Sequence, residues 1–216
     1  MKLKLACLVL GPLQNNVFFL TDEETKDCVI VDPSLHPQEQ AKYLAENDLT
    51  LRQLWVSHGH YDHFLGVPSL MESQTPHPLF GMNPDSFAHA QKQEEQYQFG
   101  MTVRALPPID LALKQGDKLS VDPASSEKFV EVREVPGHCP GSVIFYCPKG
   151  GFALVGDAIF RGSIGRTDFE GGDEALLLKS IREQIFTLPP ETVLFPGHGP
   201  QTMVGYEMEN NPFFMH

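Results

Sequence analysis

The chain has 216 residues, of which 41% are hydrophobic and 20% are charged, and its formal net charge at pH 7 is −12. These proportions are typical of a soluble globular protein and exclude an intrinsically disordered chain. The acidic balance argues against a protein whose main task is to bind nucleic-acid phosphates, because that task requires a basic surface.

The N-terminal stretch MKLKLACLVLG places two lysines before an apolar run, as a signal peptide does. The run from Leu5 to Leu10 is shorter than the hydrophobic region of about 7–15 residues in a signal peptide, and no small-residue cleavage site follows. No apolar run approaches the ~18 residues of a membrane span. The four cysteines form no Cys-x-x-Cys pair. We therefore expect a cytoplasmic protein with reduced thiols and no membrane partner.

The first third of the chain predicts short strands and one helix. The predicted strands are residues 2–10, 16–20, 28–32 and 51–57, each of them apolar or β-branched. Helical spacing of apolar residues at 36–48 separates the last two strands. A strand, a helix and a strand in succession favour a layered α/β architecture, in which loops beyond the carboxyl ends of the strands carry the functional residues.

The rest of the chain predicts four more strands and three more helices. The strands are 128–135, 142–147, 151–157 and a last one that begins at 191; the helices are 64–73, 83–99 and 172–188. Pro68 must lie in the first turn of its helix or kink it, and Asp85 or Ser86 is the expected N-cap of the next helix. Residues 101–117 look irregular. Because no internal repeat or linker is found, we expect a single domain over residues 1–216.

Histidine and aspartate gather where four of these strands end. The seven residues are His58, His60, Asp62 and His63 after the strand 51–57, His138 after 128–135, Asp157 at the end of 151–157, and His198 after the last strand. If the strands lie side by side, the four loops converge on one edge of the fold. Imidazole and carboxylate groups suit zinc, iron and manganese. Seven of them exceed the needs of one tetrahedral ion and suit two ions about 3.5–4 Å apart that share a carboxylate.

Simpler interpretations apply to some of these residues taken singly. A lone histidine at a strand end, such as His198, is more often a hydrogen-bonded loop residue, and the glycine of each PGH segment is also consistent with turn chemistry. The His-x-His-x-Asp-His cluster at 58–63 favours metal binding, because structural histidines have no reason to recur at this spacing beside an acid. A structural zinc site is usually closed by four ligands and rich in cysteine, and this cluster is neither.

The segments HGHYDHFLG, PGHCPGS, VGDAIF and PGHGP resemble, in order and approximate spacing, the metal motifs of the metallo-β-lactamase superfamily. Within it, GDAIFRGSIGRTDF and the ending PGHGPQTMVGYEMENNPF look most like the short bacterial glyoxalase II-like (hydroxyacylglutathione hydrolase-like) hydrolases. The resemblance implies an αββα four-layer sandwich with the metals at one edge. The ligands that it implies are His58, His60 and His138 on the first metal, Asp62, His63 and His198 on the second, and Asp157 bridging both.

Other residues acquire expected roles from the same resemblance. Asp32 matches a position where an aspartate supports the site without binding metal. Arg166 matches a contact for the glycine carboxylate of glutathione, although a salt bridge to Asp168 or Asp173 is the other interpretation. Cys139 replaces the threonine that is more common in the family, and we expect a buried, inert thiol.

The implied activity is metal-dependent hydrolysis by a thioesterase. Two divalent ions, zinc first and iron or manganese as alternatives, lower the pKa of bound water from 15.7 to about 7, so that the expected nucleophile is a metal-bound hydroxide held beside Asp62 and Asp157. The expected partner is a small-molecule thioester, S-D-lactoylglutathione or a related glutathione thioester. Full-length glyoxalase II enzymes carry a C-terminal helical domain that supplies much of the glutathione site, and we expect no such domain here.

Several alternatives remain open at this point. A persulfide dioxygenase has a similar pattern, and would bind a single iron through His58, His138 and Asp157 and oxidise glutathione persulfide with O₂. A lactonase or an inactive metal-binding module is a weaker alternative. A β-lactamase would be expected to carry an export signal, and a tRNA-processing nuclease would be expected to have a basic surface.

Overall fold

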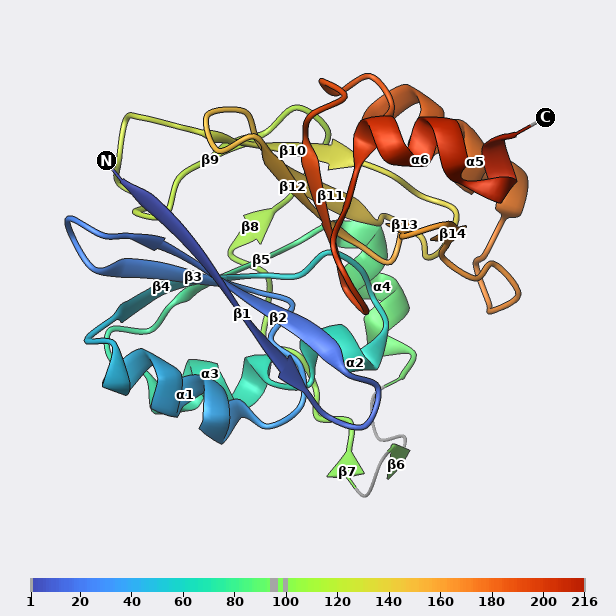
Figure 1. Ribbon diagram of the computed structural model, residues 1–216. Coiled ribbons are helices and arrows are strands. Elements are labelled where there is room, and N and C mark those ends of the chain that lie inside the picture. The colour runs from blue at the N-terminus through green and yellow to red at the C-terminus, as the bar shows by residue number, and fades with distance from the viewer. Residues whose placement is uncertain (1, 94–96, 99–100, 216) are drawn as a thin grey trace.

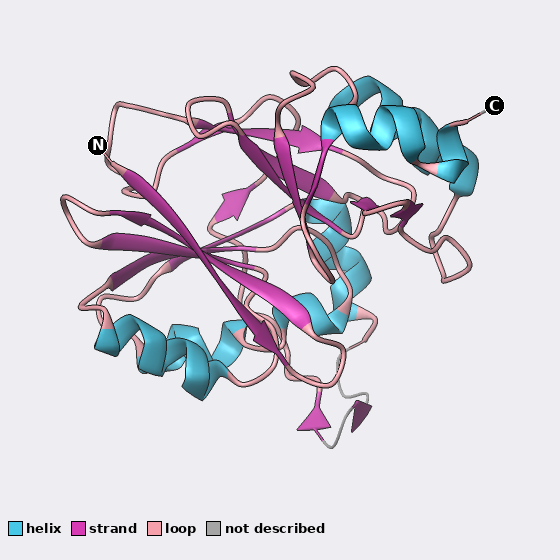
Figure 2. Cartoon of the chain, viewed as in Figure 1, coloured by secondary structure: helices cyan, strands magenta, loops and turns pink. Residues whose placement is uncertain are grey.

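Two six-stranded sheets packed face to face form the centre of the protein (Figures 1 and 2). The computed structural model describes residues 2–93, 97–98 and 101–215. The first sheet contains, in spatial order, β1 (Leu3–Leu10), β2 (Asn15–Asp22), β3 (Asp27–Val31), β4 (Thr50–Trp55), β5 (Leu79–Met82) and β8 (Leu111–Ala112). The second contains β16 (Thr202–Met203), β15 (Val193–Pro196), β12 (Phe152–Gly156), β11 (Val143–Cys147), β10 (Val130–Glu134) and β9 (Lys118–Leu119).

Helices cover the outer face of each sheet, and two small hairpins lie outside the sheets (Figure 1). The helices are α1 (Pro37–Glu46), α2 (Tyr61–Phe64), α3 (Val67–Ser73), α4 (Pro84–Gln91), α5 (Glu174–Ser180), the π-helical turn η1 (Ile181–Ile185), α6 (Val204–Asn210) and the 3₁₀ turn η2 (Pro212–Phe214). The hairpins are β6 (Tyr97–Gln98) with β7 (Met101–Thr102), and β13 (Ile159–Phe160) with β14 (Ser163–Ile164). No helix among the described residues is long and apolar enough to cross a membrane.

Successive side chains of a strand point to opposite faces of its sheet, and this alternation builds three apolar layers. In β2, Phe19 packs toward α1 and α3, whereas its neighbour Phe18 faces the second sheet. In β11, Phe145 faces the first sheet and stacks on Trp55 at 5.3 Å between ring centroids, whereas Ile144 packs toward α5. Each such buried side chain contributes about 1.5–3 kcal/mol of transfer free energy. Helix, sheet, sheet and helix layers follow, so the expected αββα sandwich is confirmed.

Strand direction brings the chemistry-bearing loops to one edge. β3, β4 and β5 are parallel neighbours, and β12 is parallel to β15. β10 and β12 both pair antiparallel with β11, so these two run in the same direction. The loops that follow β4, β10, β12 and β15 therefore leave the two sheets on the same side of the sandwich, as the sequence predicted.

The structure corrects several of the helix predictions. The N-cap of α4 is Asn83, whose side chain accepts a hydrogen bond from the backbone N–H of Asp85 at 2.9 Å, so neither Asp85 nor Ser86 caps it. That helix ends at Gln91, and residues 94–96 and 99 of the predicted segment lie outside the described residues. The helix expected at 172–188 becomes a π-helical turn after Ser180. Helix α6 follows the last strands and was not predicted.

The helix expected at 64–73 begins later, as α3 at Val67, and a separate turn, α2, precedes it; close packing at Gly66 lies between the two. A Cβ at Gly66 would lie 2.6 Å from the Ser34 carbonyl oxygen, and the Gly66 N–H donates to the Pro33 carbonyl at 2.7 Å. Pro68 lies in the first turn of α3, as predicted. The sequence did not predict α2, a single turn that carries Asp62 and His63 into the edge where the loops meet.

Candidate metal centre

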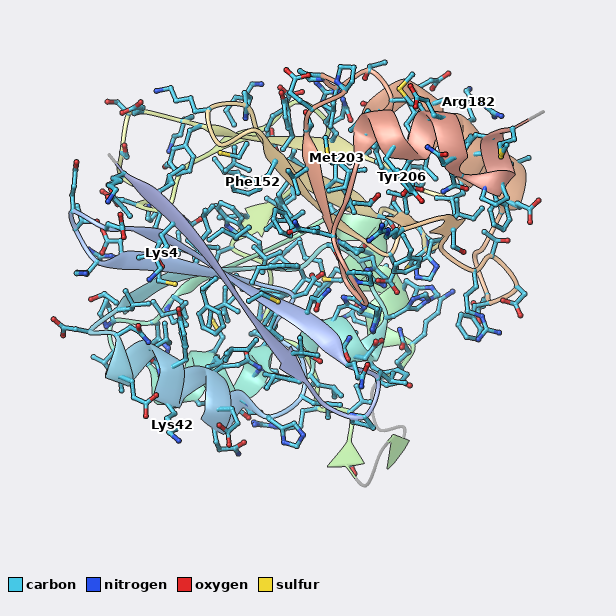
Figure 3. The ribbon with its side chains drawn as sticks, viewed as in Figure 1. Lys4, Lys42, Phe152, Arg182, Met203 and Tyr206 are labelled. Carbon is cyan, nitrogen blue, oxygen red and sulfur yellow. The ribbon has the colours of Figure 1, made fainter. Side chains whose placement is uncertain are left out.

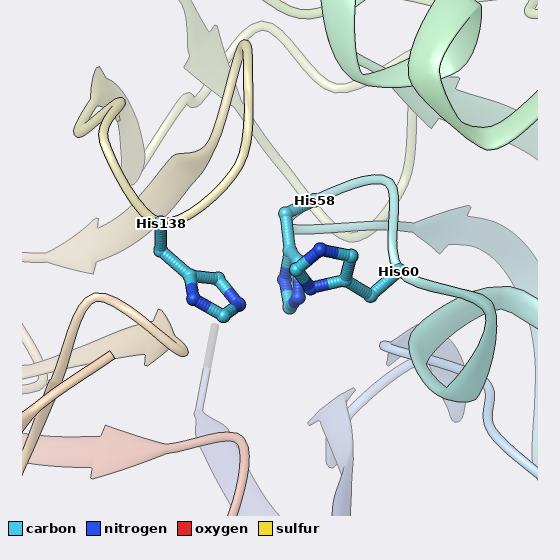
Figure 4. Close-up of side chains that lie close together, drawn as sticks. All are labelled: His58, His60 and His138. Atoms are coloured by element: carbon cyan, nitrogen blue, oxygen red, sulfur yellow. The ribbon is translucent and has the colours of Figure 1, made fainter. Parts of the chain in front are cut away.

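The structure brings all seven predicted residues together at that edge. In Figure 4, His138, from the loop after β10, faces His58 and His60 from the loop after β4. Among these seven residues, three trios have ligand atoms within 4.8 Å of one another: His58, His60 and His138; Asp62, His63 and His198; and His58, His63 and Asp157. The first two trios match the two ligand sets that the resemblance implied, and the third joins them through Asp157.

Five buried histidine and aspartate atoms at this edge have no hydrogen-bond partner among the residues that the structure describes. They are the Nε2 atoms of His58, His60, His63 and His138, and the Oδ1 atom of Asp157. A buried polar atom without a partner costs about 1–3 kcal/mol, and native proteins hold few of them. Five in one cluster, all of ligand type, fit a site that divalent metal ions complete.

Backbone carbonyls fix which ring nitrogen is free on two of the histidines. His138 Nδ1 donates to the Arg166 carbonyl at 2.7 Å, and His198 Nδ1 donates to the Leu13 carbonyl at 2.9 Å. Since a carbonyl only accepts, Nδ1 must carry the proton, and in the neutral ring Nε2 then offers its lone pair. Such bonds to the remote nitrogen are how metal-binding histidines are oriented.

Asp32 sets the tautomers of two further histidines, His58 and His63, from one carboxylate. Its Oδ2 accepts from Ser57 Oγ at 2.7 Å and from His63 Nδ1 at 3.0 Å, and its Oδ1 accepts from the Ser57 backbone N–H at 2.7 Å. Because the Ser57 hydroxyl proton is used on Asp32, Ser57 Oγ accepts from His58 Nδ1, 2.9 Å away. Asp32 is 2% exposed and has a left-handed φ of 53°. It lies behind the ligands, where the resemblance placed it.

The two catalytic candidates, Asp62 and Asp157, lie between the imidazoles. Asp157 Oδ1 is 3.5 Å from His63 Nε2, and Asp157 Oδ2 is 3.7 Å from His138 Nε2 and 3.5 Å from His198 Nε2. Asp62 Oδ2 is 3.5 Å from His63 Nε2 and 3.4 Å from His198 Nε2. Asp157 therefore faces members of both ligand sets, whereas Asp62 faces only the second.

Burial and neighbouring charges set the protonation of these groups. Burial, reinforced by His138 and His63, lowers the pKa of His60 to about 3, and burial lowers the pKa of His58 well below its usual value. Burial would raise the pKa of Asp62 and of Asp157, but the charge of His63 and the hydrogen bonds around them lower both. Neutral imidazoles and ionised carboxylates at neutral pH are the forms that bind metal.

His63 has the opposite shift. Burial would lower its pKa, but the carboxylates of Asp62, Asp157 and Asp32 outweigh it and raise the pKa well above the usual value. The carboxylates thus attract positive charge to this position, and a divalent ion bound between them would take the place of the proton.

The glycines of the two PGH segments are needed for close packing as well as for the turns. A Cβ at Gly197 would overlap Asp157 Oδ1 and lie 2.6 Å from His63 Cε1. Gly137 has a φ of 128°, and a Cβ there would overlap the backbone of Leu177 in α5. Only glycine lets these loops approach the ligands and the covering helix so closely.

Two residues at the site carry no clear sequence signal. Asn15 Nδ2 donates to Asp62 Oδ2 at 2.9 Å and lies 3.4 Å from His198 Nε2, so it positions both. His89, in α4, belongs to none of the sequence motifs, yet it lines the cavity above the candidate metal centre with its ring centroid 5.6 Å from that of His60. An asparagine at a strand start and a histidine within a helix look ordinary in the sequence.

A cavity of about 970 Å³ opens above the ligands. This volume lies at the upper end of the range of small-molecule sites, roughly 300–1,000 Å³. The side chains around it that lie beyond the metal centre include Leu13, Tyr61, Lys92, Phe160, Arg161, Arg166, Phe169 and Glu170. Aromatic walls with several basic groups suit an organic anion of moderate size.

Arg166 lines this cavity and also makes one of the two expected salt bridges. Its Nε and one terminal nitrogen each lie 2.7 Å from an oxygen of Asp168, and its guanidinium carbon lies 3.8 Å from the Phe169 ring centroid. Asp173 instead caps α5, accepting from the Leu176 N–H at 2.9 Å. Cys139 is fully buried, and burial raises the pKa of its thiol to about 12, as expected for an inert cysteine.

Comparisons with known proteins agree with this geometry. Residues 10–198 match the model of the family described as "Metallo-beta-lactamase superfamily". The hydroxyacylglutathione hydrolase GloC of Haemophilus influenzae is 33% identical over 207 residues, which cover 93% of this chain and 92% of that protein.

Two solved structures are also similar over nearly the whole chain. The BLEG-1 B3 metallo-β-lactamase superposes with a TM-score of 0.87 and 31% identity, covering 99% of this chain and 100% of that one. TTHA1623 in a di-iron-bound form superposes with a TM-score of 0.82 and 32% identity, covering 96% and 99%. With the ligand residues assembled at one edge of an αββα sandwich, these matches show that the chain belongs to the metallo-β-lactamase superfamily.

Proposed function

We propose that this metal-dependent hydrolase is a thioesterase that cleaves S-D-lactoylglutathione or a related glutathione thioester. The observation that carries the proposal is the pair of candidate ligand sets joined by Asp157, with five buried histidine and aspartate atoms that no described residue satisfies. The family allows many substrates. The similarity to a protein named as a hydroxyacylglutathione hydrolase, over more than nine-tenths of both chains, supports a glutathione thioester among them.

The protein groups divide the work between holding metal and orienting the reactants. His58, His60 and His138 would hold one ion, Asp62, His63 and His198 the other, and Asp157 would contact both. When bound, two divalent ions polarise a carbonyl and lower the pKa of bound water to about 7. Zinc is the proposed metal, and iron or manganese suits the same nitrogen and oxygen donors.

The two carboxylates are positioned to orient the attacking water. Asn15 holds Asp62 Oδ2 by a hydrogen bond of 2.9 Å, and three imidazole Nε2 atoms lie within 3.7 Å of Asp157. Both acids have a lowered pKa, so they accept hydrogen bonds from a water molecule at neutral pH and keep its lone pair turned toward the substrate carbonyl. A thiolate leaves without protonation, so departure of the thiol part requires no general acid.

The test is an assay of metal-loaded protein on S-D-lactoylglutathione, with a β-lactam and a lactone as competing substrates. We expect the thioester to have the highest kcat/KM of the three. Oxygen uptake with glutathione persulfide would instead support the dioxygenase, which would use only His58, His138 and Asp157. Protein with two ions bound and no thioesterase activity would contradict the proposal.

Arg166→Ala is expected to raise KM for S-D-lactoylglutathione about three- to tenfold and to leave kcat within about twofold. The reason is that a charge-assisted contact to a substrate carboxylate acts in the ground state and the transition state alike. The effect stays modest because Arg166 is exposed and shares its donors with Asp168. Steady-state kinetics measures it, and an unchanged KM would remove the role assigned to Arg166.

A further inference from the structure

Three basic side chains border the cavity, and two of them have an acid partner. Lys92 Nζ lies 2.7 Å from Glu170, and Arg166 pairs with Asp168. Arg161 also lines the cavity and is exposed, yet among the described residues no hydrogen bond or ion pair joins it to an acid. The chain contains 28 acidic and only 16 basic Lys and Arg residues, so acid partners are abundant. An arginine left unpaired on a cavity wall is therefore a candidate site for an anion that the protein does not supply.

The guanidinium of Arg161 rests on an aromatic ring that leaves its donors free. Its central carbon lies 5.5 Å from the centroid of the Tyr206 ring, which α6 supplies (Figure 3 labels Tyr206). A cation over a ring face is attracted by the ring quadrupole. The N–H groups of a guanidinium point outward in its plane, so this contact still allows a bidentate bond to a carboxylate.

Buried polar groups of α6 and the residue after it hold the turn that carries Arg161. Glu207, which is fully buried, accepts from the Gly162 N–H at 3.0 Å, and Asn211 Nδ2 donates to the Ser163 carbonyl at 3.0 Å. Asn211 Nδ2 also lies 2.7 Å from Glu207 Oε2. The β13–β14 hairpin is thus fastened immediately after Arg161, which lowers the entropy cost of binding a ligand there.

We infer that Arg161 binds a carboxylate of the substrate at the end remote from the scissile bond. The inference rests on the proposed function, because it takes the substrate to be an anionic thioester. Arg161, with Tyr206 beneath it, is then a specificity-determining residue that selects thioesters whose thiol part carries a carboxylate. Arg166, already paired with Asp168, gives a weaker second contact.

The test measures binding of S-methylglutathione, a thioether that cannot be hydrolysed, to the metal-loaded protein and its variants by calorimetry. Arg161→Gln is expected to weaken binding about tenfold, as the loss of one charge-assisted contact does. Arg161→Lys keeps the charge but not the bidentate geometry, so it should weaken binding by about threefold, which is half of the Arg161→Gln effect on a logarithmic scale. The diethyl ester of S-methylglutathione, which lacks both carboxylates, should bind equally to wild type and Arg161→Gln.

Arg182→Gln is the matched control. Arg182 also lies over an aromatic ring, 5.0 Å from the centroid of Phe214, but it does not line the cavity. Its substitution should leave the affinity for S-methylglutathione unchanged. The inference is overturned if Arg161→Gln binds S-methylglutathione as wild type does, if it weakens binding of the diethyl ester equally, or if wild type binds neither ligand.

Hydrolysis of S-D-lactoylglutathione by the same proteins separates this inference from the proposed function. Arg161-dependent binding without turnover would support the carboxylate site and contradict the thioesterase. Turnover in which neither the KM for S-D-lactoylglutathione nor the Kd for S-methylglutathione changes in Arg161→Gln would support the thioesterase and contradict the carboxylate site.

Discussion

Asp157→Ala is expected to abolish turnover and to lower the metal content of the purified protein. The substitution removes the carboxylate that lies 3.5–3.7 Å from three imidazole Nε2 atoms and faces both ligand sets. The loss of activity should be at least as large as the roughly 10²–10³-fold that follows the removal of one electrostatic contact to a transition state. Elemental analysis and kcat on the same preparation measure both effects.

His77→Ala is the control for this substitution, because His77 is exposed and lies outside the candidate metal centre. It should keep wild-type activity and metal. His60→Ala should act in the same direction as Asp157→Ala, since His60 Nε2 is one of the buried atoms with no hydrogen-bond partner in the described part of the chain. An Asp157→Ala protein that retains two ions and full turnover would show that this carboxylate is not a ligand.

Asp32→Asn is expected to lower metal affinity or activity about 10–100-fold, the range typical for partners that orient metal ligands. Asp32 accepts three hydrogen bonds, two from Ser57 and one from His63. In asparagine an NH₂ group replaces one of the carboxylate oxygens. Because NH₂ is a donor, it cannot accept the hydrogen bonds that this oxygen accepted. The tautomers of His58 and His63 are then no longer fixed with Nε2 free. Metal titration and kcat measure the loss.

Asp27→Asn gives a matched control for Asp32→Asn. Asp27 is also a buried aspartate, at the opposite end of β3, and pairs with Arg52 at 2.7 Å. Its substitution should lower the melting temperature and leave metal affinity unchanged. Equal loss of metal affinity in both variants would mean that Asp32 acts through general stability alone.

The gathering of the seven candidate ligands could be predicted from the sequence because it depends on local patterns and one topological rule. Apolar runs marked the strands, and His and Asp stood at their carboxyl ends. Parallel strands bring such ends to one edge of a sheet. The fold class followed from the same alternation of strands and helices, together with the resemblance to a known superfamily.

Residues that act through contacts between distant segments were missed. Asn15 reaches Asp62 across 47 positions and His198 across 183, and nothing in a strand start signals such a contact. The hairpin that carries Arg161 is held by Glu207, in a seven-residue helix too short to show periodicity. The N-cap of α4 was misplaced although Asn83 followed by Pro84 is a favoured helix start; Asn83, Asp85 and Ser86 are all residue types that can cap, and the hydrogen bond shows which one does.

The metal content of the protein purified without added metal tests the central claim most directly. Two ions per chain, of zinc, iron or manganese, are expected, with a marked decrease in Asp157→Ala and none in His77→Ala. Folded wild-type protein that holds no metal, and takes up none when the ions are supplied, would contradict the account. A single ion that is insensitive to substitution of Asp62, His63 and His198 would contradict the two-metal centre.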